Sequence, residues 1–204
     1  VTIGGVTYTA NADDTRFIVN GKNNVTLESN GNNAANSSLS VSGTGTMIVD
    51  GNTITASKSG FGGESYTITK TAEGSTLNVI KGAEVSVSLA NGSKMEILEG
   101  DSVTINGATY KADAGMTVTG NANGNPTIAL KNKNDTVTVG GNKYTAGTGN
   151  TQFVVNAPDN VTLKDNNSSL IVTTPGSMVI DGNTISSDTA GGGYTVTKTP
   201  SGDT

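Results

Sequence analysis

An internal repeat constrains this sequence more than any other feature. Four blocks of the chain recur. The first two have an offset of 136 residues, the third has an offset of 131 because an Asn-rich loop loses five residues in the second copy, and the fourth has an offset of 128. The paired blocks are VTIGGVTYTA (1–10) with VTVGGNKYTA (137–146), FIVNGKNNVTL (17–27) with FVVNAPDNVTL (153–163), MIVDGNTI (47–54) with MVIDGNTI (178–185), and YTITKT (66–71) with YTVTKT (194–199). Such agreement predicts a repeat protein, in which each unit buries its apolar face against its neighbours.

The repeat divides the chain into a first unit, residues 1–136, and a second unit, residues 137–204. A shorter internal copy, VTINGATYKA, lies at residues 103–112. The second unit stops at Thr204, which aligns with Thr76, just before an apolar strand pattern in the first unit. We therefore expect one continuous repeat array cut from a longer protein. A natural C-terminus with a degenerate last repeat is the alternative.

Apolar residues alternate with Thr or Ser over short segments, for example at 17–19, 25–27, 85–89 and 103–105. This period of two is typical of strands with one buried face, and no segment shows the 3.6-residue period of an amphipathic helix. Dipeptides such as Gly4-Gly5, Asp50-Gly51, Asn91-Gly92 and Asn106-Gly107 separate the strands and suit tight turns with positive φ. The sequence predicts an all-β fold.

Two all-β architectures suit this pattern. A β-solenoid, or β-helix-like stack of short strands, has a thin core of small β-branched residues. Tandem small antiparallel β-sandwich domains would use the same turns as hairpins. Aromatic residues make up only 4% of the chain, which is little for sandwich cores, so we favour the solenoid.

Composition excludes several classes of function. The net charge is −5 and Arg16 is the only arginine, so the chain lacks the basic stripe that nucleic-acid binding requires. No apolar run approaches the roughly 20 residues that span a bilayer, so we expect no membrane insertion of this segment. With no Cys, the chain has no disulfide scaffold, and its Thr/Asn/Gly bias suits a bacterial envelope.

Catalytic chemistry has little support in the sequence. The chain has no His and no Cys, which removes nucleophile–histidine catalysis and His or Cys metal sites. A polysaccharide-degrading β-helix enzyme remains the remote alternative, using paired carboxylates from Asp13-Asp14 or from Glu96, Glu99 and Asp101. We expect no enzyme activity and no cofactor.

Two sets of residues are candidate binding sites. Asp50, Asn52, Asp181 and Asn183 recur at equivalent positions and are weak calcium candidates, although an Asp-Gly turn explains them better. Tyr8, Tyr66, Tyr110, Tyr144 and Tyr194 alternate with Thr in strands, so they form either an exposed ligand platform or, as we favour, caps on the core with the hydroxyl in water.

The repeated VTIGGVTYTA and MIVDGNTI blocks resemble those of long, repetitive adhesin-like surface proteins of bacteria. The resemblance covers the entire chain, but no functional residue is carried over from it. It implies an extracellular location at the bacterial cell surface and a non-catalytic role as an adhesin shaft or structural spacer. The alternative is a module that binds glycans or a host surface protein, which predicts an exposed row of Tyr, Asn and Thr side chains.

Overall fold

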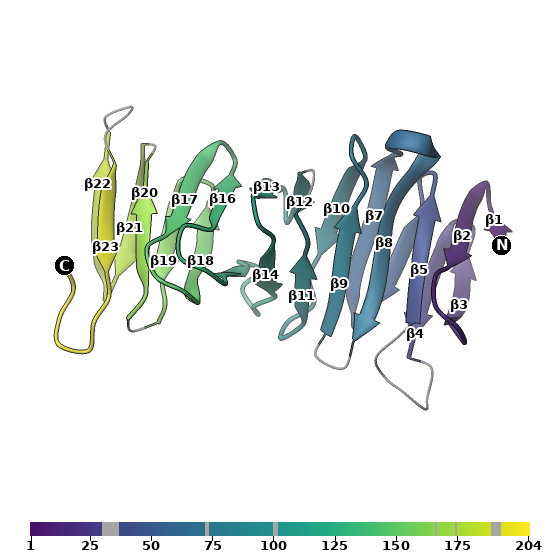
Figure 1. Ribbon diagram of the computed structural model, residues 1–204, viewed down its shortest axis with the longest axis horizontal. Coiled ribbons are helices and arrows are strands. Elements are labelled where there is room, and N and C mark those ends of the chain that lie inside the picture. Colours follow the sequence, from purple (N-terminus) through teal and green to yellow (C-terminus); the bar gives the residue numbers. More distant parts are fainter. Residues whose placement is uncertain (30–36, 72–73, 100–101, 166, 174, 189–192) are drawn as a thin grey trace.

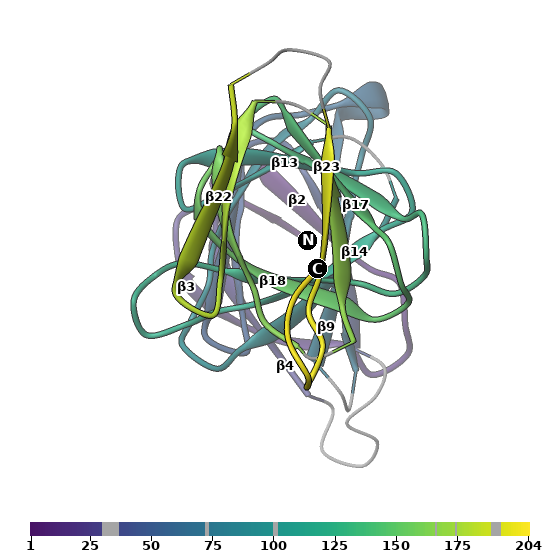
Figure 2. The same ribbon diagram turned by 90° about the vertical axis from the view of Figure 1, so that its left-hand side faces the viewer.

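The computed structural model describes residues 1–29, 37–71, 74–99, 102–165, 167–173, 175–188 and 193–204. The chain forms a β-solenoid of about eight turns that winds around one long axis (Figure 1 and Figure 2). The N- and C-terminal ends lie at opposite ends of this axis (Figure 1). The prediction of an all-β solenoid is confirmed, and the described chain does not divide into separate small sandwiches, because its two sheets and its core run without a break.

Two sheets run along the axis, and the chain passes back and forth between them. The first sheet has twelve strands, in the spatial order β1 (Thr2–Ile3), β2 (Val6–Ala10), β5 (Ser37–Ser42), β8 (Glu64–Thr71), β9 (Gly74–Val79), β11 (Lys94–Ile97), β14 (Met116–Thr119), β15 (Thr127–Leu130), β18 (Thr151–Ala157), β19 (Asn160–Leu163), β21 (Gly176–Ile180) and β22 (Asn183–Ser187). The second sheet has eleven, in the order β3 (Arg16–Gly21), β4 (Asn24–Glu28), β6 (Thr46–Val49), β7 (Asn52–Lys58), β10 (Glu84–Ser88), β12 (Val103–Ile105), β13 (Ala108–Ala112), β16 (Thr136–Val139), β17 (Asn142–Ala146), β20 (Ser169–Val172) and β23 (Tyr194–Thr197). One 3-10 turn, η1 (Phe61–Gly63), precedes β8.

The core lies between the two sheets and follows from the alternation in the sequence. In β10, for example, Val85 and Val87 are buried, whereas Glu84, Ser86 and Ser88 are exposed. Buried Val, Ile, Leu, Met and Tyr side chains from both sheets form one hydrophobic cluster from Val6 to Val196. Each turn adds only a few such residues, so the core is narrow in cross-section. It grows along the axis as turns stack on one another.

Consecutive residues with positive φ make the predicted tight turns. Asp50 and Gly51 have φ of 50° and 78°, and Asn106 and Gly107 have φ of 48° and 86°. Two positive φ values in succession define the type I′ turn, whose twist matches that of a β-hairpin. These turns join β6 to β7 and β12 to β13 as antiparallel hairpins.

Asn91-Gly92 differs from the other dipeptides because it joins strands of different sheets. It lies between β10 in the second sheet and β11 in the first, and only Gly92 has a positive φ. Such crossings place some neighbours parallel, as in the pairs β4–β6, β9–β11, β10–β12 and β19–β21, although most pairs are antiparallel.

The sequence repeat is also a repeat of strands, but corresponding strands of the two copies belong to opposite sheets. Strands β16 to β23 correspond in order to β1 to β8. Strands β1, β2, β5 and β8 belong to the first sheet, whereas their counterparts β16, β17, β20 and β23 belong to the second, and the reverse holds for β3, β4, β6 and β7. Equivalent outward-facing residues of the two copies therefore face opposite sides of the rod.

Candidate functional site: the outer faces of the two sheets

Hydroxyl side chains occupy many outward positions of both sheets, among other polar residues and a few apolar ones such as Ile18. They occupy the positions between core residues, and strand pairing aligns them across neighbouring strands. In the first sheet, Ser40 and Thr67 hydroxyls lie 2.7 Å apart, and those of Ser38 and Thr69 lie 2.9 Å apart. The outer faces therefore present regular ladders of small polar groups.

A broad hollow in the described surface lies on the outer face of the first sheet, over β9, β11, β14, β15 and β18. Strand register places one row of its residues side by side, in the order Thr76, Glu96, Thr117, Ala129 and Gln152. The hollow is shallow and open, with groups suited to hydrogen bonding of a flat polar ligand. We take it as the candidate binding face.

This hollow does not hold paired carboxylates. Glu96 is the one carboxylate among the described residues that line it, beside the ammonium groups of Lys94 and Lys131. Asp101, which we considered as a partner of Glu96, lies outside the described residues, and Asp13 and Asp14 lie exposed in the loop between β2 and β3. Among the described residues, no three His, Cys, Asp or Glu side chains are grouped as a metal site would require.

The five tyrosines do not form an exposed row. Tyr8, Tyr66, Tyr110 and Tyr144 are at most 1% exposed, and Tyr194, near the C-terminal end, is half-buried. Their rings point into the core because each stands at an inward position of its strand, and Tyr8 and Tyr144 stack or pack on Phe17 and Phe153. Of the two interpretations of these residues, the ligand platform does not fit this placement.

The hydroxyls of Tyr66 and Tyr194 contact the backbone of the neighbouring turn, and that of Tyr66 is buried rather than in water, where a simple core cap would place it. The Tyr66 hydroxyl donates toward the carbonyl oxygens of Ile54 at 3.1 Å and Gly45 at 3.3 Å. The Tyr194 hydroxyl makes the equivalent contacts in the second unit, at 3.3 Å to Ile185 and 3.4 Å to Gly176. The same hydroxyl-to-backbone tie between the two sheets is therefore present in both units, buried at Tyr66 and half-buried at Tyr194.

Burial perturbs these phenols strongly. Desolvation raises the pKa of Tyr110 to about 12, and it raises the pKa of Tyr66 and Tyr144 further. Charged phenolate is disfavoured because the apolar core cannot solvate it. The perturbation has a structural cause and marks no reactive group.

The weak calcium candidates are engaged in other contacts. The Asp50 carboxylate pairs with Lys70, and the equivalent Asp181 pairs with Lys198, whose hydrogen bond holds the pKa of Asp181 below its usual value. These lysines were missed from the sequence, although both stand at the same place in the repeated YTITKT and YTVTKT blocks.

Asn52 and Asn183 have different surroundings despite their equivalence. Asn52 is fully buried, and its side-chain oxygen accepts hydrogen bonds from the Ala90 N–H at 2.9 Å and the Ser93 hydroxyl at 2.5 Å. Asn183 is exposed at the end strand β22. Asn52 is thus a tie between successive turns rather than a metal ligand.

A repeated asparagine–threonine hydrogen bond within hairpins was not predicted from the sequence. Asn20 donates from its side chain to Thr26 at 2.8 Å, and Asn156 donates to Thr162 at 2.8 Å. Asn121 makes the same contact to Thr127 at 3.0 Å. The pattern Asn-x3-Asn-x-Thr, shared by all three hairpins, was the available signal, and it shows that β14–β15 is a third copy of β3–β4 and β18–β19.

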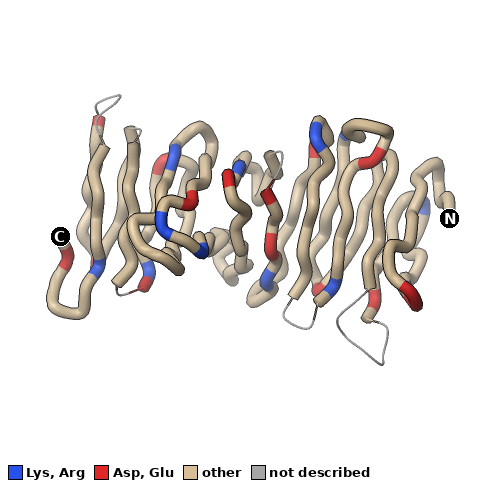
Figure 3. Tube along the Cα trace, viewed as in Figure 1, with Lys and Arg blue, Asp and Glu red and all other residues tan. Residues whose placement is uncertain are grey.

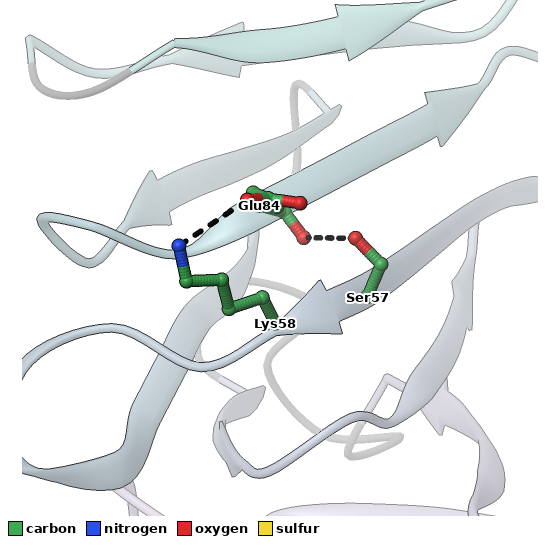
Figure 4. A network of polar contacts seen from close by, with 3 residues as sticks. All are labelled: Ser57, Lys58 and Glu84. Carbon is green, nitrogen blue, oxygen red and sulfur yellow. Dashed lines mark hydrogen bonds and ion pairs between the residues drawn. The ribbon is translucent and has the colours of Figure 1, made fainter.

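Charged side chains are scattered along the rod without a block of one sign (Figure 3). A second, smaller hollow on the outer face of the second sheet is lined in part by Ser57 and Glu84. There the Glu84 carboxylate pairs with Lys58 at 3.3 Å, and the Ser57 hydroxyl donates to the Glu84 carbonyl oxygen at 3.4 Å (Figure 4). Both charged side chains are 63% exposed, so this pair stabilises the fold little.

In the described part of the chain, no helix has the length and apolar character to cross a bilayer. Comparison of the chain with protein-family models, with curated proteins and with solved structures gave no match.

Proposed function

We propose that this chain is a non-catalytic shaft or spacer segment of a secreted bacterial surface protein of the adhesin type. The observation that carries the proposal is the single hydrophobic core, which runs without interruption from one end of the rod to the other. In a stacked core every turn buries its apolar side chains against its neighbours, so the turns form one extended body. The termini lie at opposite ends, so whatever is joined to them is held apart.

The outer faces support the same role. They carry small hydroxyl groups whose hydrogen bonds are partly used between neighbouring strands, as in Ser40–Thr67 and Thr46–Thr55. Such faces are polar and well hydrated, which suits a segment that has to remain extended without aggregating.

The spacer role is tested by display on a bacterial cell surface. A binding domain is attached beyond zero, one or two copies of the chain, and its height above the membrane is measured with a fluorescent ligand. The spacer role predicts an equal increase in height for each copy, about 50 Å from twelve strands spaced about 4.8 Å apart. No increase with copy number would contradict it.

A second candidate function, binding of glycans or a host protein, is favoured by the hollow over β9 to β18. Its aligned hydroxyl, amide and charged groups suit hydrogen bonding to a polysaccharide. Calorimetric titration with a panel of polysaccharides tests it. Binding that is lost in Thr117→Lys, in the hollow, but kept in Thr55→Lys, on the opposite sheet, would support this function. Equal binding by both variants would exclude the hollow.

A further inference from the structure

The N-terminal end of the rod leaves core-facing side chains uncovered. Strand β1 ends the first sheet, and β3 ends the second. Val1 and Val19 are 66% and 52% exposed, and Ile3 and Phe17 are only half-buried. Ile3 and Phe17 pack against the core, and Phe17 stacks on the buried Tyr8. Val1 and Val19 stand two residues from Ile3 and Phe17, so strand alternation places them on the same inward side.

The second repeat unit shows the same four positions fully covered. The equivalents Val137, Val139 and Phe153 are 0% exposed, and Val155 is 3% exposed. The pairing within the hairpin is the same in both copies, since β3 aligns with β4 in the register in which β18 aligns with β19. The difference in exposure therefore comes from what lies beyond the hairpin.

The four residues of the second unit are covered by strands β13 and β15, which come before that unit in the sequence. Strand β15 pairs antiparallel with β18, placing Ile128 opposite Phe153. The Val155 N–H donates to the Pro126 carbonyl oxygen at 3.0 Å, which shows that this side of β18 faces β15. Strand β13 pairs with β16 in the same way and places Tyr110 opposite Val139.

We propose that the edge formed by β1 and β3 is a docking surface for two strands, one on each sheet, with the sequence pattern of β13 and β15, within residues 108–130. The added strands pair antiparallel with β1 and β3, and the residue equivalent to Ile128 lies opposite Phe17. The docked segment contributes main-chain hydrogen bonds along an open edge and apolar side chains over an open core. The inference stands on the duplicated strands and is independent of the spacer role.

A fusion protein tests the proposal. Residues 102–136 are placed directly before Val1, which reproduces the junction between Thr136 and Val137 because Val137 is the equivalent of Val1. Amide hydrogen exchange is followed by NMR at Phe17 and Val19, whose N–H groups correspond to those of Phe153 and Val155. We expect exchange at both residues to slow by more than about tenfold relative to the chain alone.

The matched control is the same fusion with Ile128→Asp made only in the added segment. It should leave Phe17 and Val19 exchanging as in the chain alone, because a carboxylate cannot be buried opposite Phe17. Phe153 and Val155 in each sample report whether the rod itself is folded.

Unchanged exchange at Phe17 and Val19 in the unmodified fusion, with Phe153 and Val155 still protected, would overturn the proposal. Protection of Phe17 and Val19 in the chain alone that grows with concentration would show a second copy on this edge, and this too would overturn it.

Discussion

Replacing Tyr66 with phenylalanine removes one hydroxyl from the core without creating a cavity. Tyr66 is 0% exposed, and the change leaves the carbonyl oxygens of Ile54 and Gly45 without this donor. The hydroxyl has one proton, so the change removes one hydrogen bond that is shared between these two acceptors. Its loss in a site closed to water predicts a decrease of about 1.5 kcal/mol in the free energy of unfolding. The same change at Tyr194 should cost about 0.5 kcal/mol, because that residue is half-buried and its contacts are longer.

Urea unfolding followed by circular dichroism measures both variants. The midpoint should fall more for Tyr66→Phe than for Tyr194→Phe, with the slope unchanged in each. Solenoids can unfold in segments, so amide exchange at Leu39 and Ile68, both fully buried beside Tyr66, should report the same order of stability. Equal losses in the two variants, or no loss for Tyr66→Phe, would refute the assignment of the Tyr66 hydroxyl as a tie between the sheets.

Three further changes test other parts of the fold. Raising the pH should unfold the chain, because the folded-state pKa is about 12 for Tyr110 and still higher for Tyr66, whereas it is about 10 in the unfolded chain. The stability that depends on these neutral phenols is complete below pH 10 and falls as the pH rises toward 12. Tyrosinate absorbance that appears while the circular dichroism stays native would contradict this. Gly107→Ala should lower the free energy of unfolding in urea by about 1 kcal/mol through backbone strain alone, because Gly107 has a φ of 86° and a Cβ there meets no other atom. Gly107→Asn should cost less, since asparagine adopts positive φ more readily. Equal costs would argue against backbone strain. Asn121→Ala should lower the free energy of unfolding by about 1 kcal/mol. Asn20→Ala should lower it by less, because Asn20 lies at the exposed end of the rod. The reverse order would show that the hairpin hydrogen bond does not contribute to stability.

The repeat and the alternation of apolar residues were sufficient to predict the all-β class and the inward positions of the aliphatic residues. Successive side chains of a strand point to opposite faces, so Val85 and Val87 face the core while Glu84 and Ser86 face outward. Asp50-Gly51 and Asn106-Gly107 are hairpin turns for the reason that the sequence suggested, since both residues adopt positive φ.

The connectivity between the sheets could not be predicted from local sequence. Asn91-Gly92 and Asn106-Gly107 are the same dipeptide, yet the first crosses between sheets and the second closes a hairpin. The difference is set at long range, because Asn52 binds the backbone of Ala90 and the hydroxyl of Ser93 from a different turn. No property of residues 90–93 alone contains that contact.

The candidate sites were harder to predict for a related reason. A tyrosine that alternates with threonine suits either face of a strand, and only the position of the strand between its neighbours decides which face is buried. Asp50 likewise suits a cation or a lysine, and the choice depends on Lys70, which the fold brings to it from β8. The hollow over β9 to β18 is lined by five strands spread over residues 74–157, so no single stretch of sequence contains it.

The continuity of the rod is tested most directly by distances between spin labels on introduced cysteines, since the chain has none of its own. Thr9→Cys, Thr117→Cys and Thr184→Cys place labels on the second, seventh and twelfth strands of the first sheet. A single stacked rod predicts about 24 Å for each neighbouring pair and about 48 Å, with a narrow distribution, for the outer pair. An outer distance well below the sum of the two inner distances, or a broad distribution, would contradict one continuous solenoid.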